Sequence, residues 1–239
     1  MTVSLNSSGT GVQGSGVSTL SPAPPISNCL GKLVVLTVAF RDTGPTVSSI
    51  SGATYYYCGG GTTRLRIYCK NGEAVEPTPT VNIGSPSGRE VAQINVYNIT
   101  GGLFPTIAAD GDGVLSTQNL DLPSSAGMTY SENNVPVGGG FYVQYGLRLE
   151  AGPWGFGGIT KTSGWVDGGN YDYSGTTGML IAAQIRTAKS TTSSIARITE
   201  TITGDVPNDV LSAVTVEFSF GVNPVGENIV QPQRVLFRR

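Results

Sequence analysis

The stretch "KLVVLTVAF", residues 32–40, decides the fold class. Apolar side chains occupy nearly every position in it, instead of every second position. A strand with one face in water alternates apolar and polar residues, because successive side chains point to opposite faces. A short and almost continuous apolar run is typical of a strand that is covered on both faces. We therefore predict that residues 32–40 form a strand between two layers.

Strands with a single buried face surround this stretch in the sequence. Alternation with a period of two runs through "TRLRIYCK" (63–70), "FYVQYGLRLE" (141–150) and "VTVEFSF" (214–220). Helical periodicity is nearly absent, and only "DVPNDVLSAV" (205–214) could hold a short helical turn. Many short strands with Gly and Pro between them predict an antiparallel β-sandwich or a barrel.

The chain also reads as two matched series of strands. An apolar strand, a loop, a strand with a Ser-Gly turn, another strand and a final strand recur in the same order over 17–103 and 104–225. We predict two degenerate repeats in one composite jelly-roll-like sandwich, with an extended N-terminal arm (1–16) and a short C-terminal tail (226–239). In the match, Ser51-Gly52-Ala53 aligns with Ser163-Gly164-Trp165, so Trp165 is expected to be buried between sheets.

The composition of the chain argues against several classes of function. Charged residues make up 13% of the chain, against about 25% in a typical domain, and the net charge is −2. The few scattered basic residues argue against nucleic acid as a partner. No apolar run approaches the roughly 18 residues needed to span a membrane, and the N-terminus does not resemble a signal peptide. Histidine is absent, which removes histidine bases and histidine metal ligands. We expect no enzyme activity and no cofactor.

Three cysteines, Cys29, Cys58 and Cys69, leave at least one thiol unpaired. A tight turn at "GGG" (59–61) would place Cys58 opposite about Thr62, far from Cys69. A disulfide between them would then require a different register. We therefore predict buried thiols in a reducing compartment.

The glycine-rich stretch 151–175 gathers aromatic residues that could form a contact surface. We propose two uses for them, a protein interface or the stacking of sugar rings. These candidates are Trp154, Phe156, Tyr171 and Tyr173.

Three further patterns are candidate sites. Asp110 and Asp112 form a D-x-D pair that could bind calcium, but Val114 occupies the third ligand position of such a loop, and a Gly-Asp turn is the favoured interpretation. Asp167 and Asp172 lie beside aromatic residues, as the two acids of a glycosidase do, although any polar turn looks the same. The tyrosine-rich "TYYY" (54–57) fits an interface strand and a plain β-strand equally well. We predict no catalytic residues and no metal site.

The N-terminal segment 1–16 is rich in Ser, Gly and Thr. Such a segment cannot bury enough of its own surface to offset the entropy of ordering. We predict that it packs on a different subunit, with Val3, Leu5 and Val12 filling shallow pockets.

Several stretches together carry a family resemblance: "GKLVVLTVAF", "TVSSISGA", "TRLRIYCK", "EPTPTVNIG" and "INVYNITG". With the second series, they resemble phage- and prophage-encoded proteins built from repeated β-sandwich units with Ser-Gly-Trp-type turns. The resemblance implies a non-enzymatic virion protein that is assembled in the host cytoplasm. Its implied partners are other virion proteins, namely the major capsid protein or tail proteins, together with copies of itself. Capsid decoration, or cement, is the favoured role. The alternative is a tail- or fibre-associated adhesin that binds a host surface glycan.

Overall fold

The computed structural model describes residues 2–59 and 64–100 of the first half and, in the second half, the strands β10–β19 with the two residues after β14. All secondary structure in these residues is β-strand, and every strand pair is antiparallel. The first-half strands are β1 (Thr2–Ser8), β2 (Val12–Ser15), β3 (Thr19–Leu20), β4 (Lys32–Phe40), β5 (Thr46–Ser51), β6 (Tyr56–Gly59), β7 (Leu65–Asn71), β8 (Thr80–Gly84) and β9 (Arg89–Thr100). The second-half strands are β10 (Val114–Pro123), β11 (Ser131–Glu132), β12 (Gly140–Leu149), β13 (Ile159–Lys161), β14 (Val166–Asp167), β15 (Tyr171–Asp172), β16 (Met179–Thr187), β17 (Ile195–Ala196), β18 (Ile198–Glu200) and β19 (Val210–Ser219).

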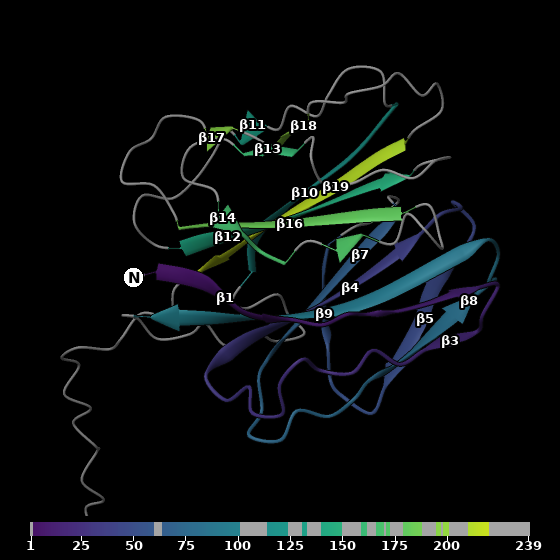
Figure 1. Ribbon diagram of the computed structural model, residues 1–239, viewed down its shortest axis with the longest axis horizontal. Coiled ribbons are helices and arrows are strands. Elements are labelled where there is room, and N and C mark those ends of the chain that lie inside the picture. Colours follow the sequence, from purple (N-terminus) through teal and green to yellow (C-terminus); the bar gives the residue numbers. More distant parts are fainter. Residues whose placement is uncertain are drawn as a thin grey trace, which may run out of the picture.

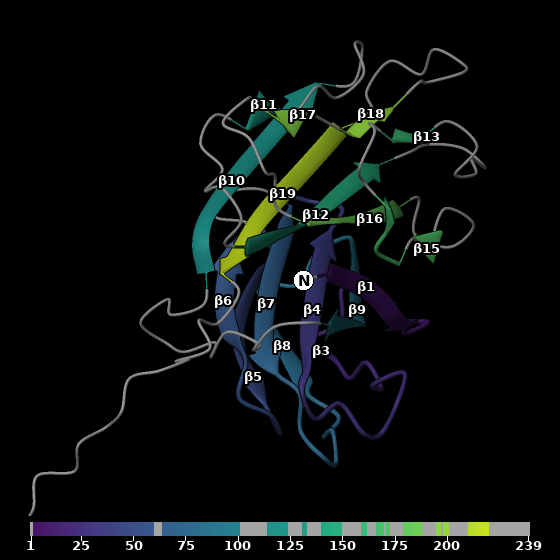
Figure 2. The ribbon, with the colours of Figure 1, turned by 90° about the vertical axis from the view of Figure 1, so that its left-hand side faces the viewer.

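Each half contributes one main sheet. The first main sheet has the order β1-β9-β4-β7-β6, with β2 also paired to β9. The second has the order β10-β19-β12-β16-β14, with β15 also paired to β16. A small sheet, β3-β8-β5, covers the outer face of the first main sheet, and the two main sheets lie next to each other (Figures 1 and 2). The result is a layered β-sandwich, as the sequence predicted.

The two main sheets follow the same strand order. In each, the first strand of the half pairs with the last, and the last pairs with the long apolar strand: β1-β9-β4 corresponds to β10-β19-β12. The small strands also pair in a corresponding way. In the first half, β8 pairs with both β3 and β5. In the second half, β17 pairs with β11, and β18 pairs with β13. Ser51 ends β5, before β6. Ser163, Gly164 and Trp165 come between β13 and β14 but lie outside the described residues.

Strand β4 is buried on both faces, which confirms the prediction from its apolar run. Leu33, Val35 and Ala39 point toward the second main sheet and enter what we call the central core. Val34, Leu36, Val38 and Phe40 point toward the small sheet and enter the outer core. The alternation predicted for β7 is also observed, since Leu65, Ile67 and Cys69 enter the central core.

The N-terminal residues correct one prediction. Residues 2–15 are not an extended arm, because β1 and β2 pair with β9 of the same chain, from Thr2 opposite Thr100 to Ser15 opposite Arg89. Val3 is buried in the central core, and Leu5 packs against that core.

Val12 packs against the outer core of its own chain. The physical reason is that an extended Ser- and Gly-rich segment still offers backbone donors and acceptors to an open sheet edge. The tail, 226–239, lies outside the described residues.

The hairpin β6–β7 corrects a second prediction. Tyr56 lies opposite Cys69, and Tyr57 lies opposite Tyr68. The connection is longer than a tight turn at 59–61, because β7 begins only at Leu65. No disulfide joins Cys29, Cys58 and Cys69, and all three are buried, as predicted. A third expectation, a helical turn in 205–214, is wrong from Val210 onward because β19 begins there.

Candidate functional site

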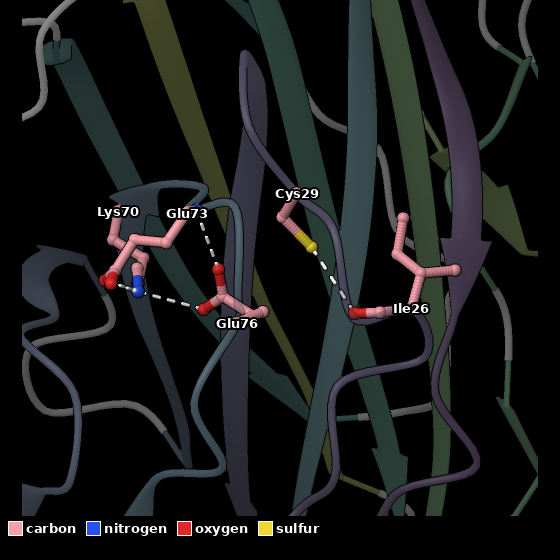
Figure 3. A network of polar contacts seen from close by, with 5 residues as sticks. All are labelled: Ile26, Cys29, Lys70, Glu73 and Glu76. Atoms are coloured by element: carbon pink, nitrogen blue, oxygen red, sulfur yellow. Dashed lines mark hydrogen bonds and ion pairs between the residues drawn. The ribbon is translucent and has the colours of Figure 1, made fainter.

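A charged network links the end of β7 to the loop that follows it (Figure 3). Lys70, near the end of β7, holds its Nζ 2.5 Å from Glu73 Oε1 and 2.9 Å from Glu76 Oε1. The backbone N–H of Glu73 donates to Glu76 Oε2 at 3.0 Å. The side chains of Lys70 and Glu76 are only 4% and 0% exposed, whereas that of Glu73 is 56% exposed. A buried ammonium between two carboxylates is compensated, so the network can fix the loop to the strand.

Backbone hydrogen bonds hold the loop that carries Glu73 and Glu76 in position. The loop after β7 runs beside the turn before β4, where Cys29 N donates to Glu73 O at 2.8 Å and Glu76 N donates to Ser27 O at 2.7 Å. A side chain on Gly72 would overlap the carbonyl oxygen of Cys29. Only glycine permits this close approach of the two segments.

The protonation states of this network do not favour nucleophilic chemistry. Desolvation lowers the pKa of Lys70, but hydrogen bonds and charge from Glu73 and Glu76 outweigh it and leave the pKa raised. Burial, aided by the charge of Glu76, raises the pKa of Cys29 to about 11. Lys70 therefore stays an ammonium and Cys29 stays a thiol near neutral pH. Both are poor nucleophiles in these forms.

A second polar cluster lies between the two halves. Ser8 Oγ donates to Asn95 Oδ1 at 2.7 Å, and Gln93 Nε2 donates to Ser8 Oγ at 3.0 Å. Asn95 Nδ2 and the Tyr97 hydroxyl both donate to the carbonyl oxygen of Gly168, at 3.2 and 2.6 Å. These bonds attach the segment after β14 to β9 of the other half.

Gly169 explains one glycine of the aromatic stretch 151–175. Its φ is +100°, and a Cβ there would lie 2.8 Å from Ser8 Oγ and 2.9 Å from Asn95 Nδ2. The glycine is thus required by backbone conformation and close packing, without any ligand.

A third polar group is the buried acid Glu90, opposite Phe40 on β4. Burial raises the pKa of its carboxyl, and the charge of Asp42 raises it further, while backbone N–H groups of Val17, Gly16 and Ser87 act in the opposite direction. Glu90 therefore sits where its charged form is disfavoured.

Most of the predicted contact residues lie outside the described residues. These are Trp154, Phe156 and Tyr173, and the same is true of Asp110 and Asp112. The backbone of Tyr171 lies in β15, opposite Ile181 of β16.

The acids Asp167 and Asp172 both lie on strands that pair with β16. Asp167 is opposite Gln184, and Asp172 is opposite Leu180. Four residues along a strand span about 13 Å. Backbone positions this far apart do not favour a glycosidase pair, whose carboxyl groups are about 5–10 Å apart.

The "TYYY" strand distributes its rings over different surroundings. Tyr55 packs against the outer core and Tyr56 against the central core. Tyr57 is 53% exposed and makes an edge-to-face contact with Tyr68, with ring centroids 5.5 Å apart. Only one of the three rings is therefore strongly exposed, which favours the plain β-strand interpretation.

Sequence reasoning missed Lys70, Glu76, Asn95 and Glu90 as members of polar clusters. The available signal was a lone charge or amide inside an apolar strand, as in "REVAQINVY" (89–97). Within the described ranges, no group of three or more His, Cys, Asp or Glu residues could hold a metal ion. No helix in this part of the chain has the length and apolar character to cross a membrane.

No family model, curated protein or solved structure matches this chain.

Proposed function

We propose that this chain is a non-enzymatic structural protein of a phage virion that decorates and cements the capsid. Its partners in this proposal are the major capsid protein and copies of itself. The observation that carries the proposal is the strand order of the two main sheets, β1-β9-β4-β7 and β10-β19-β12-β16, each accompanied by small strands in matching order. This is the order expected of two jelly-roll-like units, which we interpret as degenerate repeats. Jelly rolls are found in viral capsid and lectin domains.

Fold alone does not determine function, so the polar groups matter as well. In the described residues, Lys70 is held by two carboxylates and Asn95 by hydrogen bonds within the sandwich. These groups stabilise loops and the contact between halves. They do not converge as a nucleophile with a base, which supports a structural role over a catalytic one.

The N-terminal residues were expected to attach the protein to the particle, but β1 and β2 pair with β9 of the same chain. In this proposal, another surface contacts the capsid. We place the contact at the loops that carry Leu30 and Val75, whose side chains are 66% and 78% exposed. The hydrogen bond between Cys29 N and Glu73 O holds these two loops side by side.

The test is to mix the purified chain with particles that lack it, and then measure occupancy by electron cryo-microscopy and survival after heating. We expect specific density on the capsid and increased heat resistance. A double variant, Leu30→Asp with Val75→Asp, should reduce occupancy at least tenfold. The matched control, Val166→Asp, changes an exposed valine of the other half and should bind as the wild type does.

Two outcomes would count against the proposal. Density only at the tail or fibre would replace capsid decoration by a tail role. Binding to host glycans without binding to particles would favour the adhesin alternative, in which Trp154, Phe156, Tyr171 and Tyr173 stack on sugar rings.

A further inference from the structure

Two of the three cysteines lie together in the central core. Cys69 is on β7 opposite Tyr56, and Cys58 follows Tyr56 by two residues on β6. The register shifts between Tyr57 and Gly59, so Cys58 is the extra residue of a β-bulge. Both side chains are buried, at 5% and 0% exposure, and both belong to the central core.

The two thiols interact across adjacent strands of this core. The thiol of Cys69 hydrogen-bonds to Cys58, and the Sγ of Cys58 donates to the carbonyl oxygen of Tyr56 at 3.3 Å. Neighbouring thiols on adjacent strands can be joined if the backbone lets the sulfurs close the remaining gap. A bulge next to one of them supplies that local freedom, because it interrupts the regular ladder.

The third cysteine is separated from this pair by the sheet itself. Cys29 belongs to the outer core, on the opposite face of the first main sheet, and its Sγ contacts the carbonyl oxygen of Ile26 at 3.6 Å. Only one of the three pairings is therefore compatible with the fold.

We propose that Cys58 and Cys69 are a disulfide site that ties the edge strand β6 to β7 when the protein meets an oxidising disulfide. The first step is attack of one thiolate on a small disulfide such as oxidised glutathione, which releases one molecule of reduced glutathione. The second cysteine then attacks this mixed disulfide and releases another. The two cysteines lose two electrons and two protons in total, and the small disulfide is reduced to two thiols.

The position of Cys58 and Cys69 determines how a disulfide between them would affect the protein. β6 is the last strand on its side of the first main sheet, and edge elements open before central ones. A covalent bond to β7 would prevent this opening. Burial and the hydrogen bond to Cys58 raise the pKa of Cys69, so oxidation of the folded chain should be slow and should accelerate with pH.

The experiment uses the full chain, purified under reducing conditions and then incubated with oxidised glutathione. Thiol titration after denaturation should fall from three thiols to one. Peptide mapping without reductant should recover one linked pair containing Cys58 and Cys69. The oxidised form should unfold at higher denaturant concentration, and a reductant should reverse this shift.

Variants separate this pairing from the alternatives. Cys29→Ser should still lose two thiols and form the same linked peptide. Cys58→Ser should keep its two thiols, and Cys58→Ala serves the same purpose if the serine variant does not fold. Retention of all three thiols in the wild type, or a linked peptide that contains Cys29, would overturn the proposal. This test does not depend on the proposed virion role.

Discussion

The two faces of the first main sheet bury polar groups in different places. The outer face packs on the small sheet, and its charged groups, Glu90 and Lys70, lie toward the ends of the strands. The central face packs on the second half and has Thr37, Gln93 and Asn95 on neighbouring positions of β4 and β9. Both faces are closed to water, but on the central face two buried amides, Gln93 and Asn95, lie in the middle of β9.

The two faces therefore contribute to the fold in different ways. Apolar burial on the outer face supplies free energy without selecting one alignment, because the hydrophobic effect is not directional. Hydrogen bonds from Asn95 and Tyr97 to Gly168 require one alignment of the two halves. We infer that the outer core mainly stabilises and that the central polar cluster also fixes register.

The largest expected effect tests whether both cores are equally tight. Leu36→Ala in the outer core and Leu33→Ala in the central core each remove a fully buried side chain from β4. Each should lower the free energy of unfolding by about 2–5 kcal/mol, measured by chemical denaturation. The control, Val75→Ala at an exposed site, should change it by less than about 0.5 kcal/mol. A small effect of Leu33→Ala alone would mean that the halves do not share one core in solution.

A smaller effect tests the bonds that fix register. Tyr97→Phe removes the hydroxyl that donates to Gly168 O at 2.6 Å. The loss should be about 0.5–1.5 kcal/mol, because Asn95 still donates to the same oxygen. Hydrogen exchange should show the larger increase at β14 and β16 and little change in the small sheet. Equal increases on both sides would contradict a local role.

The third prediction concerns pH and the rim of the outer core. The pKa of Glu90 is raised in the folded chain above its unfolded value of about 4.3, so the folded state binds the proton more tightly. Its contribution to stability is fully present below about pH 4.3 and is lost as the pH rises through the folded pKa. Glu90→Gln should therefore gain stability relative to the wild type as the pH increases, measured by urea denaturation across that range. Asp42→Asn should narrow the range, because it removes a charge that raises the pKa of Glu90. A pH-independent difference between Glu90→Gln and the wild type would contradict this assignment.

The smallest expected effect lies in the middle of the central face. Thr37 Oγ1 is buried and has no hydrogen-bond partner among the described residues. Thr37→Val replaces it with a methyl group of similar size and should leave stability unchanged or raise it by up to about 1 kcal/mol. A clear loss of stability would indicate that the hydroxyl has a partner, such as a buried water.

Some of these features were predictable from the sequence, and others were not. The apolar run of β4 and the alternation of β7 predicted their burial correctly, because side-chain period reports directly on which faces are covered. β1 and β2 were missed, since their pairing depends on backbone hydrogen bonds and their Ser-rich composition resembles that of a free segment. The contact of Cys58 with Cys69 was missed because the length of a hairpin connection is not visible in a glycine run.

The polar clusters could not be predicted either. Lys70 meets Glu76 only because the loop after β7 folds back beside Cys29, and Asn95 meets Gly168 across more than seventy residues of chain. Such contacts depend on tertiary arrangement, which local pattern does not encode.

The pairing of β1 with β9 bears on how the chain is made. During synthesis the first residues emerge early, but their partner strand ends only at Thr100. β1 therefore has no place in the sheet until the ribosome has released β9 through Thr100, and contacts of such long range form slowly. A bulky group placed directly before Thr2 would have to be carried to the sheet edge in this late step, which makes that position a poor one for a rigid label.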